Sequence, residues 1–260
     1  MSDSDPVIVR HDGAVAQLRF NRPQALNAID ADMARQILAA VDAIARNPSV
    51  RAVVLSGVGK AFMAGGDLMA MKADPRAIAE EIIAPLHRAL LLLASIDAPV
   101  IASVHGVVAG AGVSLMLNAD LALAAEGTRF NLAYVNIGTS SDGGASFALP
   151  RVVGLRNAME IALLGDGFDA AHAQRLGLVN RLVPAAELEA ETLRLAHRLA
   201  AGPTRAMGHT RRLLRRSFES SYAEQLDAEQ AAFAACAESA DFLEGIQAFF
   251  DKRPARFQGS

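Results

Sequence analysis

The first apolar runs of the chain are short and rich in strand-forming residues. Val7–His11 and Ala14–Phe20 are such runs, and Asp12 and Gly13 between them are typical of a tight hairpin turn. The sequence therefore predicts that the chain opens with an antiparallel pair of strands.

A helical spacing of apolar positions follows. It begins after Asp30, a residue suited to cap a helix, and stops before Asn47 and Pro48, which favour a helix end. The apolar positions on the predicted face are Met33, Ile37, Val41 and Ile44. We expect a helix from Asp30 to about Ala45.

Strand-like and helical runs then alternate as far as residue 124. Strands are predicted at Arg51–Ser56, Pro99–Val104 and Asp120–Ala124, and helices around Ala77–Ala94 and from about Ala111 to Asn118. Alternation of this kind indicates a parallel α/β fold.

After Pro184 the pattern is helical only. The predicted helices are Glu187–Ala200, Thr204–Ser217, Tyr222–Glu238 and Asp241–Phe250. Their apolar faces, which include Phe218, Leu226, Phe233, Phe242 and Phe249, must be covered by the core or by another subunit. We therefore divide the chain into a core, residues 1–200, and a helical oligomerisation region, residues 201–260.

Composition excludes several classes of protein. With 25 basic and 28 acidic residues, the net charge of -3 favours neither nucleic acid nor an anionic membrane as a partner. The densest basic cluster is Arg211, Arg212, Arg215 and Arg216, which we interpret as a solvated or subunit-facing helix surface. One cysteine allows no internal disulfide, and the start MSDSDP has no secretory pattern, so we expect a cytoplasmic protein.

One segment, Ala98–Leu117, has the length of a membrane span and contains no full charge. Pro99, His105 and three glycines interrupt it, however, and its first half is rich in β-branched residues. We interpret it as a buried strand, a glycine turn and a buried helix rather than a membrane helix.

Glycine-rich sites are the first candidates for chemistry. Residues 57–61 lack the Ser or Thr that follows the lysine of a phosphate loop, and residues 110–112 lack the third glycine of a dinucleotide site. Instead, residues 62–67 and 106–112 each follow a strand and precede a helix, with small side chains. Two interpretations are open. The turns have only a structural role, or their backbone N–H groups both donate to one substrate oxygen and form an oxyanion hole.

Several longer motifs decide between these readings. They are FNRPQALNAI at 20–29, VVLSGVGKAFMAGGDL at 53–68, APVIASVHGVVAGAGVSLMLNADLALAAE at 98–126, DGGASFALPRVVG ending at Gly154, and LLGDGFDAAHAQRLGLVNRLVP ending at Pro184. In order and spacing they resemble the enoyl-CoA hydratase/isomerase, or crotonase, superfamily. The resemblance implies an α/β fold with a crotonase-like ββα spiral core and a C-terminal helical trimerisation region, often stacked as a dimer of trimers.

The resemblance also implies a site for an acyl-CoA thioester. Its carbonyl oxygen would accept hydrogen bonds from the backbone N–H groups of Gly66 and Ala111. Residues implied to contact CoA are Gln24, Ala25, Leu26, Ala64, Gly66, Asp67 and Leu68, with Phe249 and Lys252 reaching it, sometimes across a subunit boundary. Asp67 is equally well explained as a helix cap, and Phe249 and Lys252 as packed or solvated residues.

The reaction depends on acid and base groups. Hydratases of this superfamily use two glutamates, and here Ser114 and Tyr134 stand at those positions. A serine without a base and a tyrosine, whose ordinary pKa is about 10, disfavour hydration. Ser114 and Tyr134 are instead expected to line the acyl pocket.

Asp142 stands where the enoyl-CoA isomerases of the superfamily carry a carboxylate, although Asp before Gly-Gly is also typical of a turn. We predict an isomerase that shifts a 3-enoyl to a 2-enoyl double bond, with Asp142 as its acid/base and no cofactor apart from the CoA of the substrate. Alternatives are a hydratase, a hydrolase, carbon–carbon bond cleavage, a ring-processing isomerase or a non-catalytic CoA-thioester-binding homologue. His87 and His105 are interpreted as a helix-face and a packed histidine.

Overall fold

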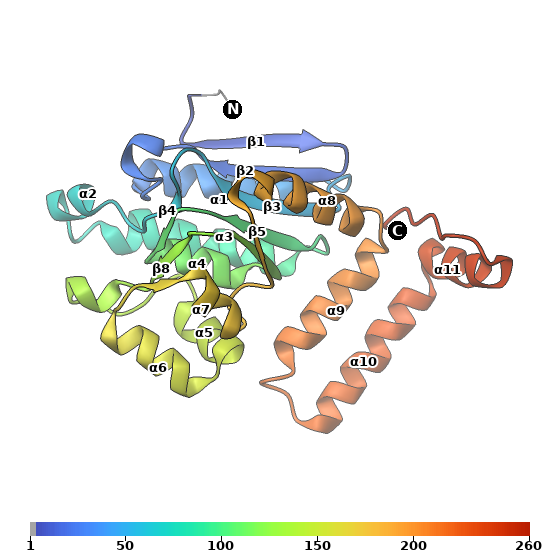
Figure 1. Cartoon of the computed structure of the whole chain (residues 1–260). Coiled ribbons are helices and arrows are strands. Elements are labelled where there is room, and N and C mark those ends of the chain that lie inside the picture. Colours follow the sequence, from blue (N-terminus) through green and yellow to red (C-terminus); the bar gives the residue numbers. More distant parts are fainter. Residues whose placement is uncertain (1–3) are drawn as a thin grey trace.

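Two β-sheets surrounded by helices make up the chain, for which a computed structural model describes residues 4–260 (Figure 1). The strands are β1 (Val7–Asp12), β2 (Val15–Phe20), β3 (Ala52–Gly57), β4 (Ala61–Met63), β5 (Val100–Val104), β6 (Val107–Ala109), β7 (Leu121–Ala125), β8 (Arg129–Asn131), β9 (Phe168–Asp169) and β10 (Arg181–Val183). The large sheet has the order β1-β2-β3-β5-β7-β10 and the small sheet β4-β6-β8-β9. The first three residues of the predicted core lie outside the described range.

Helices cover the large sheet and extend beyond it. They are α1 (Ala31–Ala45), α2 (Leu68–Ala73), α3 (Ala84–Ser95), α4 (Ala111–Asn118), α5 (Ala145–Val153), α6 (Leu155–Leu164), α7 (Ala170–Arg175), α8 (Leu188–Ala200), α9 (Thr204–Arg216), α10 (Tyr222–Ala237) and α11 (Ala240–Asp251). Short helical turns are η1 (Pro23–Ala25), η2 (Ile78–Ile83), η3 (Tyr134–Ile137) and η4 (Ala185–Glu187). Figure 1 shows α9, α10 and α11 extending away from the sheets.

The predicted elements are largely present. Strands β1 and β2 pair antiparallel, with Asp12 opposite Val15, and the remaining pairs of the large sheet are parallel. Asp30 caps α1, since its carboxylate accepts a hydrogen bond from Met33 N–H at 2.9 Å. The predicted helix 77–94 is divided into a π-helical turn, η2, and α3. Pro85 lies in the first turn of α3 and has no N–H to donate to the turn before it, which accounts for the interruption.

The large sheet is buried on both faces. Along β3, Val53 and Leu55 face the main apolar core, which also contains residues of α1 and α3. Ala52 and Val54 point the other way, into a second cluster formed with α8. Because successive side chains of a strand alternate between faces, a strand covered on both sides reads as a continuous apolar run.

The apolar segment Ala98–Leu117 forms the predicted strand, β5, and the predicted helix, α4, and the glycine turn between them also contains a short strand that was not predicted, β6. Within residues 4–260, no helix has the length and apolar character needed to cross a membrane.

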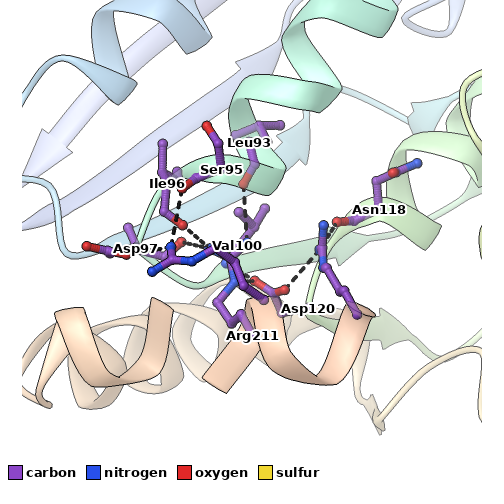
Figure 2. Close-up of polar contacts among 11 residues, drawn as sticks. Leu93, Ser95, Ile96, Asp97, Val100, Asn118, Asp120 and Arg211 are labelled. Carbon is purple, nitrogen blue, oxygen red and sulfur yellow. Dashed lines mark hydrogen bonds and ion pairs between the residues drawn. The ribbon is translucent and has the colours of Figure 1, made fainter. Parts of the chain in front are cut away.

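Arginines of α9 attach the C-terminal helices to the core (Figure 2). Arg211 is 8% exposed, forms an ion pair with Asp120 at 2.6 Å, and donates to Ala98 O at 2.9 Å and Leu93 O at 3.2 Å. Arg215 binds Asp120 at 3.0 Å and donates to Asn118 O at 2.8 Å. A further ion pair joins Arg212 to Asp97 at 2.6 Å.

The interpretation of this arginine cluster as a solvated or subunit-facing surface is therefore wrong for three of its four members. The last carbonyls of α3 and α4 have no partners within their own helices, and they need donors. The arginines donate hydrogen bonds to these carbonyls, and their positive charges interact favourably with the negative ends of both helix dipoles. The core of the same chain therefore binds this face of α9.

Candidate active site

The two glycine turns meet because the strands before them are neighbours. Strands β4 and β6 pair in parallel, with Met63 opposite Val108, so the turns that follow leave the same edge of the small sheet. A Cβ on Gly65 would lie 3.3 Å from Ala109 O, and one on Gly110 would lie 3.5 Å from the Cα of Gly65. Both glycines have positive φ, +105° and +50°. The two backbones are thus in van der Waals contact.

Each turn carries an approachable backbone donor. Gly66 forms a parallel bridge with Ile29 in which Gly65 O and Asp67 N make the hydrogen bonds, and no group within residues 4–260 accepts from Gly66 N–H. Ala111 is the first residue of α4, where N–H groups have no intrahelical acceptor. Each of the two turns therefore carries one backbone N–H group without an acceptor within residues 4–260, and their joint role as an oxyanion hole stays a prediction.

A third segment lies beside the first turn. Leu26 O accepts a hydrogen bond from Ala64 N–H at 3.0 Å, which brings Gln24 and Ala25 of η1 next to the turn. Asn27, fully buried with φ +59°, holds the two segments together. Its Nδ2 lies within hydrogen-bonding distance of Val58 O, Ala61 O and Phe62 O. Asn27 was not among the predicted site residues, although Asn is one of the residue types that most often adopt left-handed backbone.

Asp67 is a helix cap. Its carboxylate accepts hydrogen bonds from the N–H groups of Met69 and Ala70 at the start of α2 and forms an ion pair with Arg22 at 3.1 Å. Burial alone would raise the pKa of Asp67, but the hydrogen bonds from Ala70 and Arg22 lower it below the ordinary value. Leu68 follows it with 54% of its surface exposed.

Asp142, Tyr134 and Ser114 come together from a loop, η3 and α4. The hydroxyl of Tyr134 donates a short hydrogen bond to Oδ1 of Asp142. The hydroxyl of Ser114 donates to the backbone oxygen of Asp142 at 2.9 Å and lies 3.0 Å from the Tyr134 hydroxyl. Within residues 4–260 no group binds the other carboxylate oxygen, Oδ2. One oxygen of Asp142 is held and the other is free.

The environment of Tyr134 keeps its hydroxyl protonated. Burial, and then the charge of Asp142 and the hydrogen bond to it, raise the pKa of Tyr134 well above its ordinary value. Tyr134 is therefore a hydrogen-bond donor to Asp142 throughout the neutral range.

Two residues that the sequence analysis did not assign to the site hold the loop after Asp142. Asn118 Nδ2 donates to Gly143 O at 2.8 Å. His87, an exposed residue of α3 as expected, accepts a hydrogen bond from Gly143 N–H at Nε2, 3.1 Å away. Accepting there requires the neutral tautomer with its proton on Nδ1. Neither contact has a local sequence signal, because the partners are 25 and 56 positions apart.

His105 lies at the end of β5, and its Nε2 is 2.9 Å from Gly59 O, which agrees with its interpretation as a packed histidine. Within residues 4–260 no group of three or more His, Cys, Asp or Glu side chains is arranged to hold a metal ion.

Phe249 and Lys252 lie apart from the other predicted site residues. Both lie at the end of α11, which Figure 1 shows on the opposite side of the molecule from α2. The Phe249 side chain is 78% exposed, and its ring contacts Phe250. Within a single chain these two residues are not brought to the glycine turns.

Comparisons with known proteins agree with this architecture. The family model described as enoyl-CoA hydratase/isomerase matches residues 10–260. A 1,2-epoxyphenylacetyl-CoA isomerase of Escherichia coli K12 is 33% identical, covering 94% of this chain and 95% of the relative, and a probable enoyl-CoA hydratase of Rhodobacter capsulatus is 36% identical, covering 94% and 95%. An enoyl-CoA hydratase subunit I from Geobacillus kaustophilus superposes with a TM-score of 0.92 at 34% identity over 100% of both chains. The chain belongs to the enoyl-CoA hydratase/isomerase family.

Proposed function

We propose that this protein is an enoyl-CoA isomerase that converts a 3-enoyl to a 2-enoyl thioester with Asp142 as its only acid/base. The observation that carries the proposal is the Asp142 carboxylate, which Tyr134 holds at Oδ1 and which keeps Oδ2 free. Membership of the family indicates a CoA-thioester substrate, and the Asp142 carboxylate favours isomerisation over the family's other reactions.

The proposed reaction needs one base used twice. Oδ2 of Asp142 takes a proton from C2 of the 3-enoyl thioester, and the electron pair forms a dienolate whose negative oxygen accepts hydrogen bonds from Gly66 and Ala111 N–H. The protonated Asp142 then returns the proton to C4, and the remaining double bond lies between C2 and C3. Each backbone donor contributes roughly 3–4 kcal/mol to stabilising the dienolate-like transition state. The sequence of steps requires no metal, nicotinamide or flavin.

The same geometry argues against hydration as the main reaction. Tyr134, with its raised pKa, keeps its proton and cannot act as a base near neutral pH. Ser114 has a single hydroxyl proton, and Asp142 O accepts it. Neither residue is arranged to activate water.

A second candidate is isomerisation of a ring-bearing acyl-CoA. The observation that favours it is the Escherichia coli relative, whose name specifies 1,2-epoxyphenylacetyl-CoA. The same base and the same oxyanion donors would serve both substrates.

Asp142→Asn tests the assignment. The amide cannot take a proton from C2, so turnover of 3-enoyl-CoA is expected to fall by about 10²–10⁴-fold while acyl-CoA affinity changes little. Turnover is followed by the ultraviolet absorbance of the conjugated product, with mass detection of isomers, hydrated products and free acids, on straight-chain and ring-bearing thioesters.

Asp169→Asn is the matched control, because Asp169 caps α7 and Asn caps a helix equally well. It should keep wild-type turnover. An Asp142→Asn enzyme that still isomerises, or a wild type that only hydrates the thioester, would contradict the proposed function.

We also propose a homotrimer or a dimer of trimers. The support is a set of large apolar side chains left exposed on α9, α10 and α11 and the turn between α9 and α10: Leu214, Phe218, Tyr222, Leu226, Phe233, Leu243, Ile246, Phe249 and Phe250. In such an assembly, Phe249 and Lys252 would contact CoA bound to a neighbouring subunit. Light scattering of the purified protein distinguishes a trimer from a hexamer.

A further inference from the structure

Helix α4 binds the loop of Asp142 as well as carrying an oxyanion donor. Ala111, Ser114 and Asn118 are spaced at i, i+3 and i+7, so they share one face of the helix. Ser114 Oγ donates to Asp142 O at 2.9 Å, and Asn118 Nδ2 donates to Gly143 O at 2.8 Å. The donor for the thioester oxygen and the loop of the base are thus connected through one short helix.

The loop after Asp142 packs tightly against α4 at Gly143 and Gly144. Gly143 and Gly144 have φ angles of +58° and +76°. A Cβ on Gly143 would lie 2.9 Å from Ser114 Cβ, and one on Gly144 would lie 3.2 Å from Asn118 Nδ2. Only glycines allow both this conformation and this approach, so the loop lies directly against Ser114 and Asn118 of α4.

Asn118 is itself held in place. Its Nδ2 also donates to Ser114 O, one helical turn earlier, at 2.8 Å. Its backbone oxygen accepts from Arg215 of α9 at 2.8 Å, and Figure 2 shows Asn118 at this end of the arginine cluster. Because both its side chain and its carbonyl are bonded, the amide is oriented before any substrate arrives.

We propose that Asn118 is a positioning residue for Asp142: it fixes the loop of the base relative to the oxyanion donor on the same helix. This inference rests on the proposed function of Asp142. Loss of the Asn118 bond lets the loop move, and misplacement of a reacting group by about 1 Å can reduce turnover by about 10²-fold.

Two variants remove the bond in different ways. Asn118→Leu has similar size and no donor, and Asn118→Asp keeps the shape but offers only acceptors to Gly143 O. In both, we expect kcat for 3-enoyl-CoA to fall about 10-fold to 100-fold with KM within about twofold, because binding groups are untouched. Amide hydrogen exchange of residues 140–145 should become faster in both variants.

The matched control is Asn157→Leu. Asn157 on α6 also donates from Nδ2 to a carbonyl one turn earlier, Val153 O at 2.8 Å, but no bond joins it to the Asp142 loop. This variant should keep wild-type kcat and wild-type exchange in residues 140–145. Thermal unfolding of all the variants shows whether each is folded.

The outcomes separate this inference from the proposed function. Unchanged kcat and loop exchange in both Asn118 variants, or a raised KM at constant kcat, overturns the positioning role of Asn118 while Asp142→Asn remains inactive. If Asp142→Asn retains turnover, the proposed function fails, and with it any role of Asn118 in placing a base.

Discussion

Proton positions around Asp142 follow from a short count of donors. Tyr134 has one hydroxyl proton, which it donates to Oδ1, and Ser114 has one, which lies within reach of both the backbone oxygen of Asp142 and the Tyr134 hydroxyl. The motifs pointed to all three residues. Their mutual contacts could not be predicted, because 20 positions separate Ser114 from Tyr134 and only the tertiary fold brings the two hydroxyls together.

The pKa of Tyr134 can be measured directly. The chain has two tyrosines and no tryptophan, so in a Tyr222→Phe protein the ultraviolet signal of tyrosinate comes from Tyr134 alone. We expect Tyr134 to remain protonated past its ordinary pKa of about 10, because burial and Asp142 raise its pKa. Adding Asp142→Asn should lower the midpoint, since it removes the negative charge.

The raised pKa of Tyr134 also makes the stability of the fold depend on pH. The contribution of Tyr134 is fully present below about pH 10, where the unfolded tyrosine is protonated too, and it is lost as pH rises through the higher folded-state pKa. A midpoint near the ordinary value in both proteins would show that the hydroxyl does not bind Asp142.

At the scale of elements, boundaries set by local residues were the predictable ones. Asp30 caps α1, and α4 runs from Ala111 to Asn118 as expected. Both boundaries were predictable because a helix cap or a glycine turn depends on only a few adjacent residues. The small sheet was not predicted. Its strands have two or three residues each, too few for a periodic signal, and they exist because neighbouring strands pair with them, β4, β6 and β8 in parallel and β9 antiparallel to β8.

Gly112 decides how closely α4 approaches the small sheet. A Cβ there would lie 2.4 Å from Met63 O, a backbone atom that cannot rotate away. Gly112→Ala should therefore lower the free energy of unfolding by about 1–3 kcal/mol and reduce turnover, because the first turn of α4, with Ala111 N–H, is pushed outward. Chemical denaturation and steady-state kinetics measure the two effects.

Gly245→Ala on α11 is the comparison. Its Cβ would meet only the Phe257 ring at 3.5 Å, an ordinary contact, and alanine favours a helix over glycine by about 0.5–1 kcal/mol. That variant should be as stable as the wild type or more so. Equal effects of the two substitutions would show that Met63 yields to the added methyl group.

At the scale of the molecule, the C-terminal helices and the core are joined by buried charge as well as by apolar contact. Arg211 and Asp120 are 8% and 16% exposed at their side chains. The helices of this region were predictable from the periodicity of their apolar residues. The attachment of α9 to the core was not, because the spacing of arginines is the same on a helix face that contacts solvent and on one that contacts the core. The predicted division at residue 200 stays a prediction.

Arg211→Ala should be strongly destabilising. It leaves Asp120 with one arginine instead of two and removes the donors to the end of α3, at a cost of about 3–5 kcal/mol. Arg46→Ala is the control, because Arg46 is 78% exposed in its ion pair with Asp42, and such pairs contribute about 0–1 kcal/mol. Urea unfolding at one protein concentration compares them, and similar midpoints would contradict the buried anchor.

The bond from Tyr134 to Oδ1 also has a stereochemical consequence for the proposed reaction. With only Oδ2 of Asp142 available, a single oxygen on one side of the flat dienolate serves both C2 and C4. The proton that leaves and the proton that arrives therefore use the same face, which makes the allylic shift suprafacial. A deuterium placed on that face at C2 would in part reappear at C4 of the product.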